Sequence, residues 1–75
     1  MSLEKIFAEV FAIPEATVID TLPLDEIASW DSLAHMMLIT RLEESYRIEF
    51  TGDEIADMHC VGDARSALRA HGAAL

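Results

Sequence analysis

The residues with the clearest chemical potential are Asp31, Ser32 and Leu33, where a long loop becomes the strongest predicted helix of the chain. Backbone N–H groups at the start of a helix have no partners within the helix, and they give that end a partial positive charge. A serine hydroxyl beside them is a favourable site for a phosphate group. The sequence therefore indicates Ser32 as the main candidate for a functional residue.

Two other roles for Ser32 compete with that one. As an enzyme nucleophile it lacks activation, because no Gly-x-Ser-x-Gly turn surrounds it and no histidine base with an acidic partner can be assigned. As a helix-capping residue it is ordinary, since Asp and Ser are the usual residues at such positions. A serine that another enzyme modifies needs only exposure and a recognisable surface, and this role fits the position of Ser32.

The other chemically capable residues give weaker signals. His35 falls on the core side of its predicted helix and is expected to pack there. His59 and Cys60 are adjacent, but two ligands do not make a zinc site, so Cys60 is expected to cap or pack at the start of the last helix. The acids between residues 20 and 26 match no EF-hand spacing and are expected on a solvated face. We therefore expect no metal site and no catalytic residue.

Size and composition bound the class of protein. The chain has 75 residues, of which 52% are apolar, enough for one core and too few to enclose a substrate cleft of ordinary size. The sequence predicts a single domain over residues 1–75 that is not an enzyme.

The net charge and the targeting signals indicate which partners and which compartment to expect. Fourteen acidic and five basic residues give a net charge of −9, which repels nucleic acid and anionic membranes and favours basic protein surfaces, although the same charge also serves solubility. One cysteine excludes an internal disulfide. No signal peptide or membrane-spanning run is recognisable. We expect a cytoplasmic monomer, and Met1 with compact ends favours a free-standing protein.

Apolar spacing predicts an all-α fold, a small four-helix bundle of three longer helices and one short helix with a long first loop. The expected buried stripe of the first helix comprises Leu3, Ile6, Phe7 and Val10. Ser2 can cap this helix, and Pro14 cannot continue it. Thr51 and Glu54 fit a capping box that starts the short helix, and Gly72 suits the end of the last. The predicted helices cover residues 3 to 11–13, 32–46, 53–58 and 61–63 onward, and the long loop covers residues 15–30.

The helix over residues 32–46 has apolar residues on two sides. A helix that buries one face has no use for the second set, and exposed apolar clusters rimmed by charge often mark a binding surface. The alternative is that a loop or the short helix covers that set. The core stripe comprises His35, Leu38, Ile39, Leu42 and Tyr46; the opposite side carries Leu33, Met36, Met37, Thr40, Glu43, Glu44 and Arg47.

The order of helix, long loop, Asp-Ser-Leu, long helix, short helix and final helix resembles the acyl carrier protein and peptidyl carrier protein family over almost the whole chain. The resemblance implies that Ser32, flanked by Asp31 and Leu33, carries a 4′-phosphopantetheine arm taken from coenzyme A. It implies that Asp31 is associated with metal when a phosphopantetheinyl transferase attaches the arm.

The resemblance also implies a partner-binding face. Leu33, Met36 and Met37 match positions on the partner-facing side of the family's recognition helix, and Thr40 lies on the same side. Glu43 and Glu44 match acidic positions that pair with arginines and lysines of partner enzymes. The implied partners, besides the transferase, are enzymes that load and process acyl or aminoacyl groups held as thioesters.

The chain departs from the fatty-acid carriers around the motif. Those carriers usually have a glycine shortly before Asp-Ser-Leu, where Ser29 and Trp30 stand here. They often place acids after the motif, where this chain has Ala34 and Met37. The departures favour a dedicated carrier in polyketide, nonribosomal peptide or related biosynthesis. The alternative is a small acidic helical adaptor that binds partners through the same face and is never modified.

Overall fold

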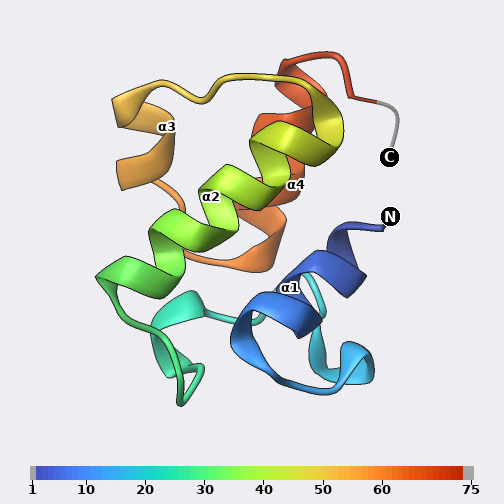
Figure 1. Ribbon diagram of the computed structural model, residues 1–75, viewed down its shortest axis with the longest axis vertical. Coiled ribbons are helices and arrows are strands. Elements are labelled where there is room, and N and C mark those ends of the chain that lie inside the picture. The colour runs from blue at the N-terminus through green and yellow to red at the C-terminus, as the bar shows by residue number, and fades with distance from the viewer. Residues whose placement is uncertain (1, 74–75) are drawn as a thin grey trace.

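The computed structural model describes residues 2–73, which form an all-α bundle of three longer helices and one short one (Figure 1). The predicted fold class is confirmed. Met1, Ala74 and Leu75, the ends of the domain predicted over residues 1–75, lie outside the described residues. The elements are α1 (Leu3–Phe11), the 3₁₀ turns η1 (Glu15–Thr17) and η2 (Leu24–Glu26), α2 (Ser32–Tyr46), α3 (Gly52–Ala56) and α4 (Val61–Ala70).

Local chemistry sets the ends of α1. The Ser2 hydroxyl accepts a hydrogen bond from the Lys5 N–H at 3.2 Å, as predicted for a capping serine. The helix ends at Phe11 and is capped by Ala12, which has a left-handed backbone with φ of 54° and whose N–H donates to the Ala8 carbonyl. Pro14 follows two residues later, so the chain turns before the proline is reached.

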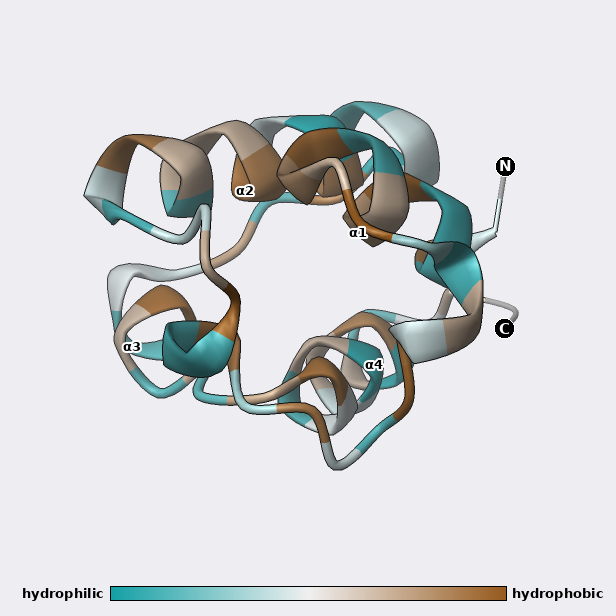
Figure 2. Cartoon of the chain, turned by 90° about the horizontal axis from the view of Figure 1, so that it is seen from below, coloured by the Kyte–Doolittle hydropathy of each residue, from teal (hydrophilic) through white to brown (hydrophobic). Residues whose placement is uncertain are grey.

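The core lies between two layers, α1 with α2 on one side and α3 with α4 on the other (Figure 2). In α1 the buried stripe includes Leu3, Phe7 and Phe11, spaced four residues apart. Val10, which we expected in that stripe, is only half-buried, because Phe11 continues the four-residue spacing. In α2 the buried residues are Leu38, Ile39 and Leu42, as predicted, whereas His35 and Tyr46 are half-buried.

The long loop between α1 and α2 is held by buried side chains and by α4. Val18, Leu24 and Ile27 are buried. The first two N–H groups of α4 donate to loop carbonyls, Val61 to Leu22 at 3.1 Å and Gly62 to Asp20 at 2.9 Å. Cys60 stands at the N-cap of α4, but its side chain makes no capping hydrogen bond. The loop backbone therefore satisfies donors that a capping side chain usually serves.

Arg65 ties three segments together. Its Nη2 donates to Glu4 Oε2 of α1 at 2.6 Å, and its Nε donates to Asp20 Oδ1 of the loop at 2.9 Å. Asp20, expected to be only a solvated acid, thus has a specific partner. Arg65 lies in the middle of α4 and links α1, the loop and α4.

The hydrogen bond from Arg65 lowers the pKa of Glu4 below its usual 4.5. A carboxyl whose pKa is depressed in the folded state stabilises the fold above its unfolded pKa and loses that contribution as pH falls through the folded pKa. We expect Arg65→Met to lower the free energy of unfolding by about 1 kcal/mol at pH 7. Below pH 4.5 the difference from wild type should shrink. Urea titrations across this range measure it, and parallel curves at all pH values would contradict the assignment.

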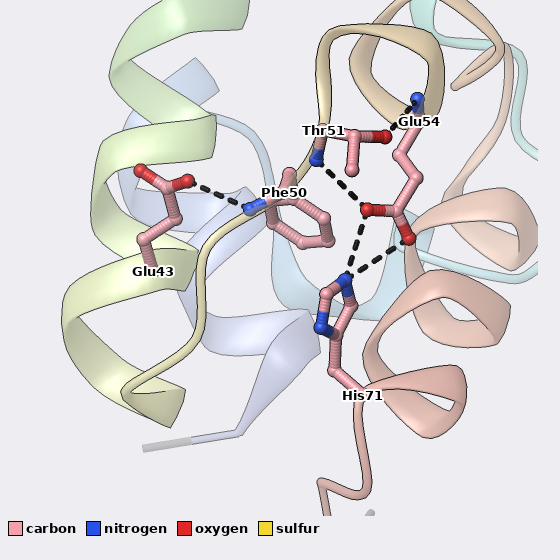
Figure 3. Close-up of polar contacts among 5 residues, drawn as sticks. All are labelled: Glu43, Phe50, Thr51, Glu54 and His71. Atoms are coloured by element: carbon pink, nitrogen blue, oxygen red, sulfur yellow. Dashed lines mark hydrogen bonds and ion pairs between the residues drawn. The ribbon is translucent and has the colours of Figure 1, made fainter.

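The short helix α3 begins with a capping box between Thr51 and Glu54 (Figure 3). The Thr51 hydroxyl accepts from the Glu54 N–H, and the Glu54 carboxylate accepts from the Thr51 N–H. His71, just after α4, contacts the same carboxylate at 2.9 and 3.1 Å and meets the Phe50 ring edge-on. The Thr51 N–H and then His71 lower the pKa of Glu54. Glu54 therefore connects the start of α3 to the residue that follows α4.

Candidate functional site

Ser32 is the first residue of α2, and it is exposed. Asp31, not Ser32, caps the helix: its Oδ1 accepts from the Ala34 N–H at 2.7 Å, and its backbone is extended. The serine hydroxyl is therefore not the capping group. It stands at the positive end of a fifteen-residue helix that has no acidic residue in its first turn.

The loop before Ser32 is fixed by two hydrogen bonds and one buried side chain. The Ser29 hydroxyl donates to the Phe11 carbonyl at the end of α1, at 2.7 Å. The Trp30 N–H donates to the Ile27 carbonyl at 2.9 Å, and Ile27 is buried. Ser32 thus sits on an anchored segment rather than on a free loop.

The cap gives a stability prediction for Asp31. Asp31→Ala should lower the free energy of unfolding by about 1 kcal/mol, because the Ala34 N–H loses its partner, whereas Asp31→Asn should cost little, because asparagine caps equally well. Urea denaturation followed by Trp30 fluorescence compares the two. Equal losses in both variants would show that the charge, and not the capping bond, is what stabilises this helix start.

A groove of about 370 Å³ opens beside Ser32. Trp30 and His35 line it from the motif side, and the nitrogens Trp30 Nε1 and His35 Nε2 are buried without a hydrogen-bond partner. Burial, and then the charge of His59, lowers the pKa of His35, so the neutral imidazole is favoured. The remaining lining residues are Ser32, Met36, Ile55, Ala56, Met58 and His59.

These features fit a phosphate-linked group at Ser32. The hydroxyl is exposed, the helix start favours a phosphate, and the adjoining groove has polar atoms in need of partners. Sequence reasoning found Ser32 and Asp31 but missed the groove, because α3 supplies one wall from residues more than twenty positions further along the chain. The position of Trp30 directly before the motif was the one available signal.

The second apolar side of α2 is exposed. Leu33, Met36 and Met37 have exposed fractions of 71%, 49% and 52%, so neither the loop nor α3 covers them. Thr40 is exposed on the same side. A shallow hollow of about 380 Å³ on this side is lined by Leu33, Met36, Met37, Thr40 and Arg41. Arg41 pairs with Glu9 of α1 at 2.6 Å. We call Leu33, Met36, Met37 and Thr40 the α2 face.

The two acidic residues predicted at the rim differ. Glu44 is exposed. Glu43 is half-buried, and its Oε2 accepts a hydrogen bond from the Phe50 N–H at 2.9 Å (Figure 3). Glu43 therefore has a structural contact that the sequence did not reveal, and Glu44 is the freer of the two for a partner's basic side chain.

Within residues 2–73 no group of three or more His, Cys, Asp or Glu side chains is arranged to hold a metal ion. No helix in that range is long and apolar enough to cross a membrane.

Comparison with known proteins finds solved structures that are similar to this chain. No protein-family model matches the chain, and neither does any curated protein. The solution structure of a holo acyl carrier protein from Geobacter metallireducens is 34% identical, with a TM-score of 0.81, and the match covers 91% of this chain and 78% of that one. A candidate acyl carrier protein from Mycobacterium tuberculosis, 20% identical over 93% of this chain and 99% of that one, has the same fold, with a TM-score of 0.79. The chain therefore belongs to the acyl carrier protein family, as a carrier rather than an enzyme.

Proposed function

We propose that Ser32 carries 4′-phosphopantetheine and that the protein delivers acyl or aminoacyl intermediates in polyketide, nonribosomal peptide or related biosynthesis. The observation that supports this most is the exposed Ser32 hydroxyl at the start of α2, beside an aspartate that does the capping in its place. The group, when attached, supplies a thiol that holds the cargo as a thioester.

The residues around Ser32 each have a task in this proposal. On a separate transferase, Ser32 Oγ would form a bond to the pantetheine-bearing phosphorus of coenzyme A as the pyrophosphate bond breaks and adenosine 3′,5′-bisphosphate leaves, and the hydroxyl proton would pass to a base of the transferase. The N–H groups at the start of α2 stabilise the negative charge of the resulting phosphodiester. Asp31 keeps the Ala34 N–H occupied and leaves its second carboxylate oxygen for the transferase's metal ion.

The role proposed for Asp31 is testable apart from its cap. Asp31→Asn keeps the capping bond and removes the charge, so we expect it to fold like wild type and to be loaded at least tenfold more slowly, which corresponds to a loss of about 1.4 kcal/mol in the transition state. Initial loading rates at several magnesium concentrations measure the effect. A wild-type rate at every magnesium concentration would remove Asp31 from the proposed site.

The α2 face is the proposed docking surface for the transferase and for the loading and processing enzymes. Its apolar area is small, which suits contacts that must form and separate at each step. Glu44 adds an acidic rim for basic partner residues, and so does the carboxylate oxygen of Glu43 that does not accept from the Phe50 N–H. Fatty-acid carriers often have acids just after the motif and one turn on, where α2 has Ala34 and Met37, and this less acidic start of the helix supports a specialised set of partners.

Met37 offers a test of that surface. Met37→Glu places a charge in the middle of the α2 face, at a side chain that is already half exposed. We expect a change within about 0.5 kcal/mol in the free energy of unfolding and a loss of docking to a cognate loading enzyme, measured as the rise in KM for the carrier. Ile19→Glu, an exposed apolar residue away from α2, is the matched control. An equal KM for both variants would contradict docking through this face.

The proposal as a whole is tested by intact mass. The purified protein is incubated with a broad-specificity phosphopantetheinyl transferase, coenzyme A and magnesium, and we expect a gain of one phosphopantetheine. A folded protein that gains nothing with several transferases would contradict the proposal. That result would favour the unmodified adaptor, which uses the α2 face alone.

A further inference from the structure

We propose that Ser29 is a positioning residue for the modification of Ser32. Its hydrogen bond to the end of α1 holds residues 29–31 in place, and with them the Asp31 carboxylate beside the Ser32 hydroxyl. This inference rests on the proposed attachment of phosphopantetheine to Ser32. It deepens that proposal by adding a residue that lies outside Asp-Ser-Leu and does not itself contact the reacting atoms.

The hydrogen bond of Ser29 joins the loop to a helix. Ser29 Oγ donates to the Phe11 carbonyl oxygen at 2.7 Å, although the two residues are 18 positions apart. Phe11 is the last residue of α1, and the last carbonyls of a helix have no partner within the helix. The Ser29 hydroxyl therefore satisfies the end of α1 and ties the loop to it shortly before Ser32.

The end of α1 is a firm anchor for this bond. Phe11 is buried, and its ring lies 6.1 Å from that of Phe7 between centroids. The next residue, Ala12, donates its N–H to the Ala8 carbonyl, so the backbone on the far side of Phe11 is held as well. Packed core side chains change position little. A hydrogen bond to this carbonyl therefore fixes Ser29 relative to the core.

The Asp31 backbone is held from two sides. On the helix side, Asp31 Oδ1 accepts from the Ala34 N–H at 2.7 Å. On the loop side, the Trp30 N–H donates to the Ile27 carbonyl at 2.9 Å, and the bond from Ser29 extends this support to α1. In the proposed function one Asp31 oxygen caps α2 and the other is left for the transferase's metal ion. Both oxygens move if the backbone of residues 29–31 moves, so the support on the loop side bears directly on that role.

Loss of the Ser29 bond should affect the chemical step more than docking. A displacement of reacting groups by about 1 Å can cost on the order of a hundredfold in rate. The α2 face, which is the proposed docking surface, lies outside residues 29–31 and is unchanged. An effect on positioning therefore lowers kcat for loading and leaves the KM for the carrier nearly constant. Met37→Glu, on the docking surface, is expected to give the opposite pattern.

Two substitutions of Ser29 test this directly. Ser29→Ala removes the hydroxyl, and we expect kcat for loading by a phosphopantetheinyl transferase to fall about tenfold, the worth of one hydrogen bond. The KM for the carrier should change by less than about twofold. Ser29→Thr keeps a hydroxyl on the same carbon and should recover most of the lost rate.

Ser2→Ala is the matched control. It also removes a serine hydroxyl that bonds to α1, since Ser2 Oγ accepts from the Lys5 N–H. Ser2 caps the opposite end of the helix, about 12 Å along its axis from Phe11. Loss of a cap costs at least as much stability as loss of an exposed side-chain hydrogen bond. Loading of Ser2→Ala at the wild-type rate therefore separates positioning from general destabilisation.

The mobility of the segment gives a readout that needs no transferase. Backbone ¹⁵N relaxation is measured on the unmodified wild type and on the three variants. In the wild type and Ser2→Ala we expect order parameters of about 0.85 at the Trp30 and Asp31 amides, the level of a rigid backbone. In Ser29→Ala they should fall towards about 0.6, the level of a flexible segment, and Ser29→Thr should restore them.

The outcomes are distinguishable. Loading of Ser29→Ala at the wild-type kcat would overturn the inference and leave the proposed function standing. An equal loss of rate in Ser2→Ala would also overturn it, because the cause would then be general destabilisation. So would slow loading of Ser29→Ala with unchanged order parameters, because the hydroxyl would then act by touching the transferase. Absence of any mass gain in the wild type would contradict the proposed function, and the inference falls with it.

Discussion

Replacing Ser32 with alanine is expected to abolish loading with phosphopantetheine while leaving the fold intact. The attachment atom is the Ser32 hydroxyl oxygen, and alanine has nothing to replace it. The helix start survives because Asp31 makes the capping bond to Ala34, and alanine is a favourable residue inside a helix. The free energy of unfolding should therefore stay within about 0.5 kcal/mol of wild type.

Intact mass after a transferase reaction, beside circular dichroism and urea denaturation, checks both parts of this prediction. Ser45→Ala is the matched control, since Ser45 is an exposed serine near the other end of the same helix. Ser45→Ala should be loaded like wild type. A full mass gain in the folded Ser32→Ala protein would place the attachment elsewhere.

The second large effect is expected from the core. Phe7 is fully buried and lies 6.1 Å from Phe11 between ring centroids. Phe7→Ala should lower the free energy of unfolding by about 3–5 kcal/mol, from the lost burial and the cavity left behind. A chain of this length is expected to have a total of only about 4–11 kcal/mol. The melting temperature of the variant should thus fall by at least about 12 °C.

Thermal denaturation followed by circular dichroism measures this effect. Ile19→Ala serves as the control, because Ile19 is a large apolar residue that is 57% exposed, and it should change stability by less than about 0.5 kcal/mol. Similar melting curves for the two variants would show that Phe7 does not occupy the core as described.

Local signals predicted the helices well. The bounds of α2 agree because the N-cap aspartate and the apolar spacing act within one or two turns. The capping box of α3 agrees for the same reason. The predicted end of α3 was later than the observed one, because Asp57 leaves helical geometry at the turn towards buried Met58. Val10 was placed in the core by spacing alone, which does not distinguish the edge of a stripe from its centre.

Contacts between distant residues were not predictable from the sequence. Arg65 pairs with Glu4, 61 positions away, and His71 contacts Glu54, 17 positions away. Such pairs depend on how the helices pack against one another, and no periodic pattern in the sequence encodes that packing. For the same reason Glu43 was assigned to the partner-facing rim, although its carboxylate also accepts from the Phe50 N–H.

Part of the candidate site could likewise be predicted from the sequence, and part depends on how the helices pack. Ser32, Asp31 and the exposed α2 face follow from residue types and helical spacing, and their positions at the helix start and on its outer side agree with the structure. The groove beside Ser32 needed α3 to be placed against the Trp30 loop. The unsatisfied nitrogens of Trp30 and His35 became visible only with that packing.

The central claim is that phosphopantetheine is attached to Ser32, and tandem mass spectrometry of the loaded wild-type protein tests it most directly. Fragmentation of the peptide that spans Trp30 to Arg41 should place the added mass on Ser32, with the arm released as the characteristic neutral loss of a phosphodiester. An adduct located on another residue, such as Cys60, or an unmodified Ser32 peptide from a protein that has gained mass, would contradict the account.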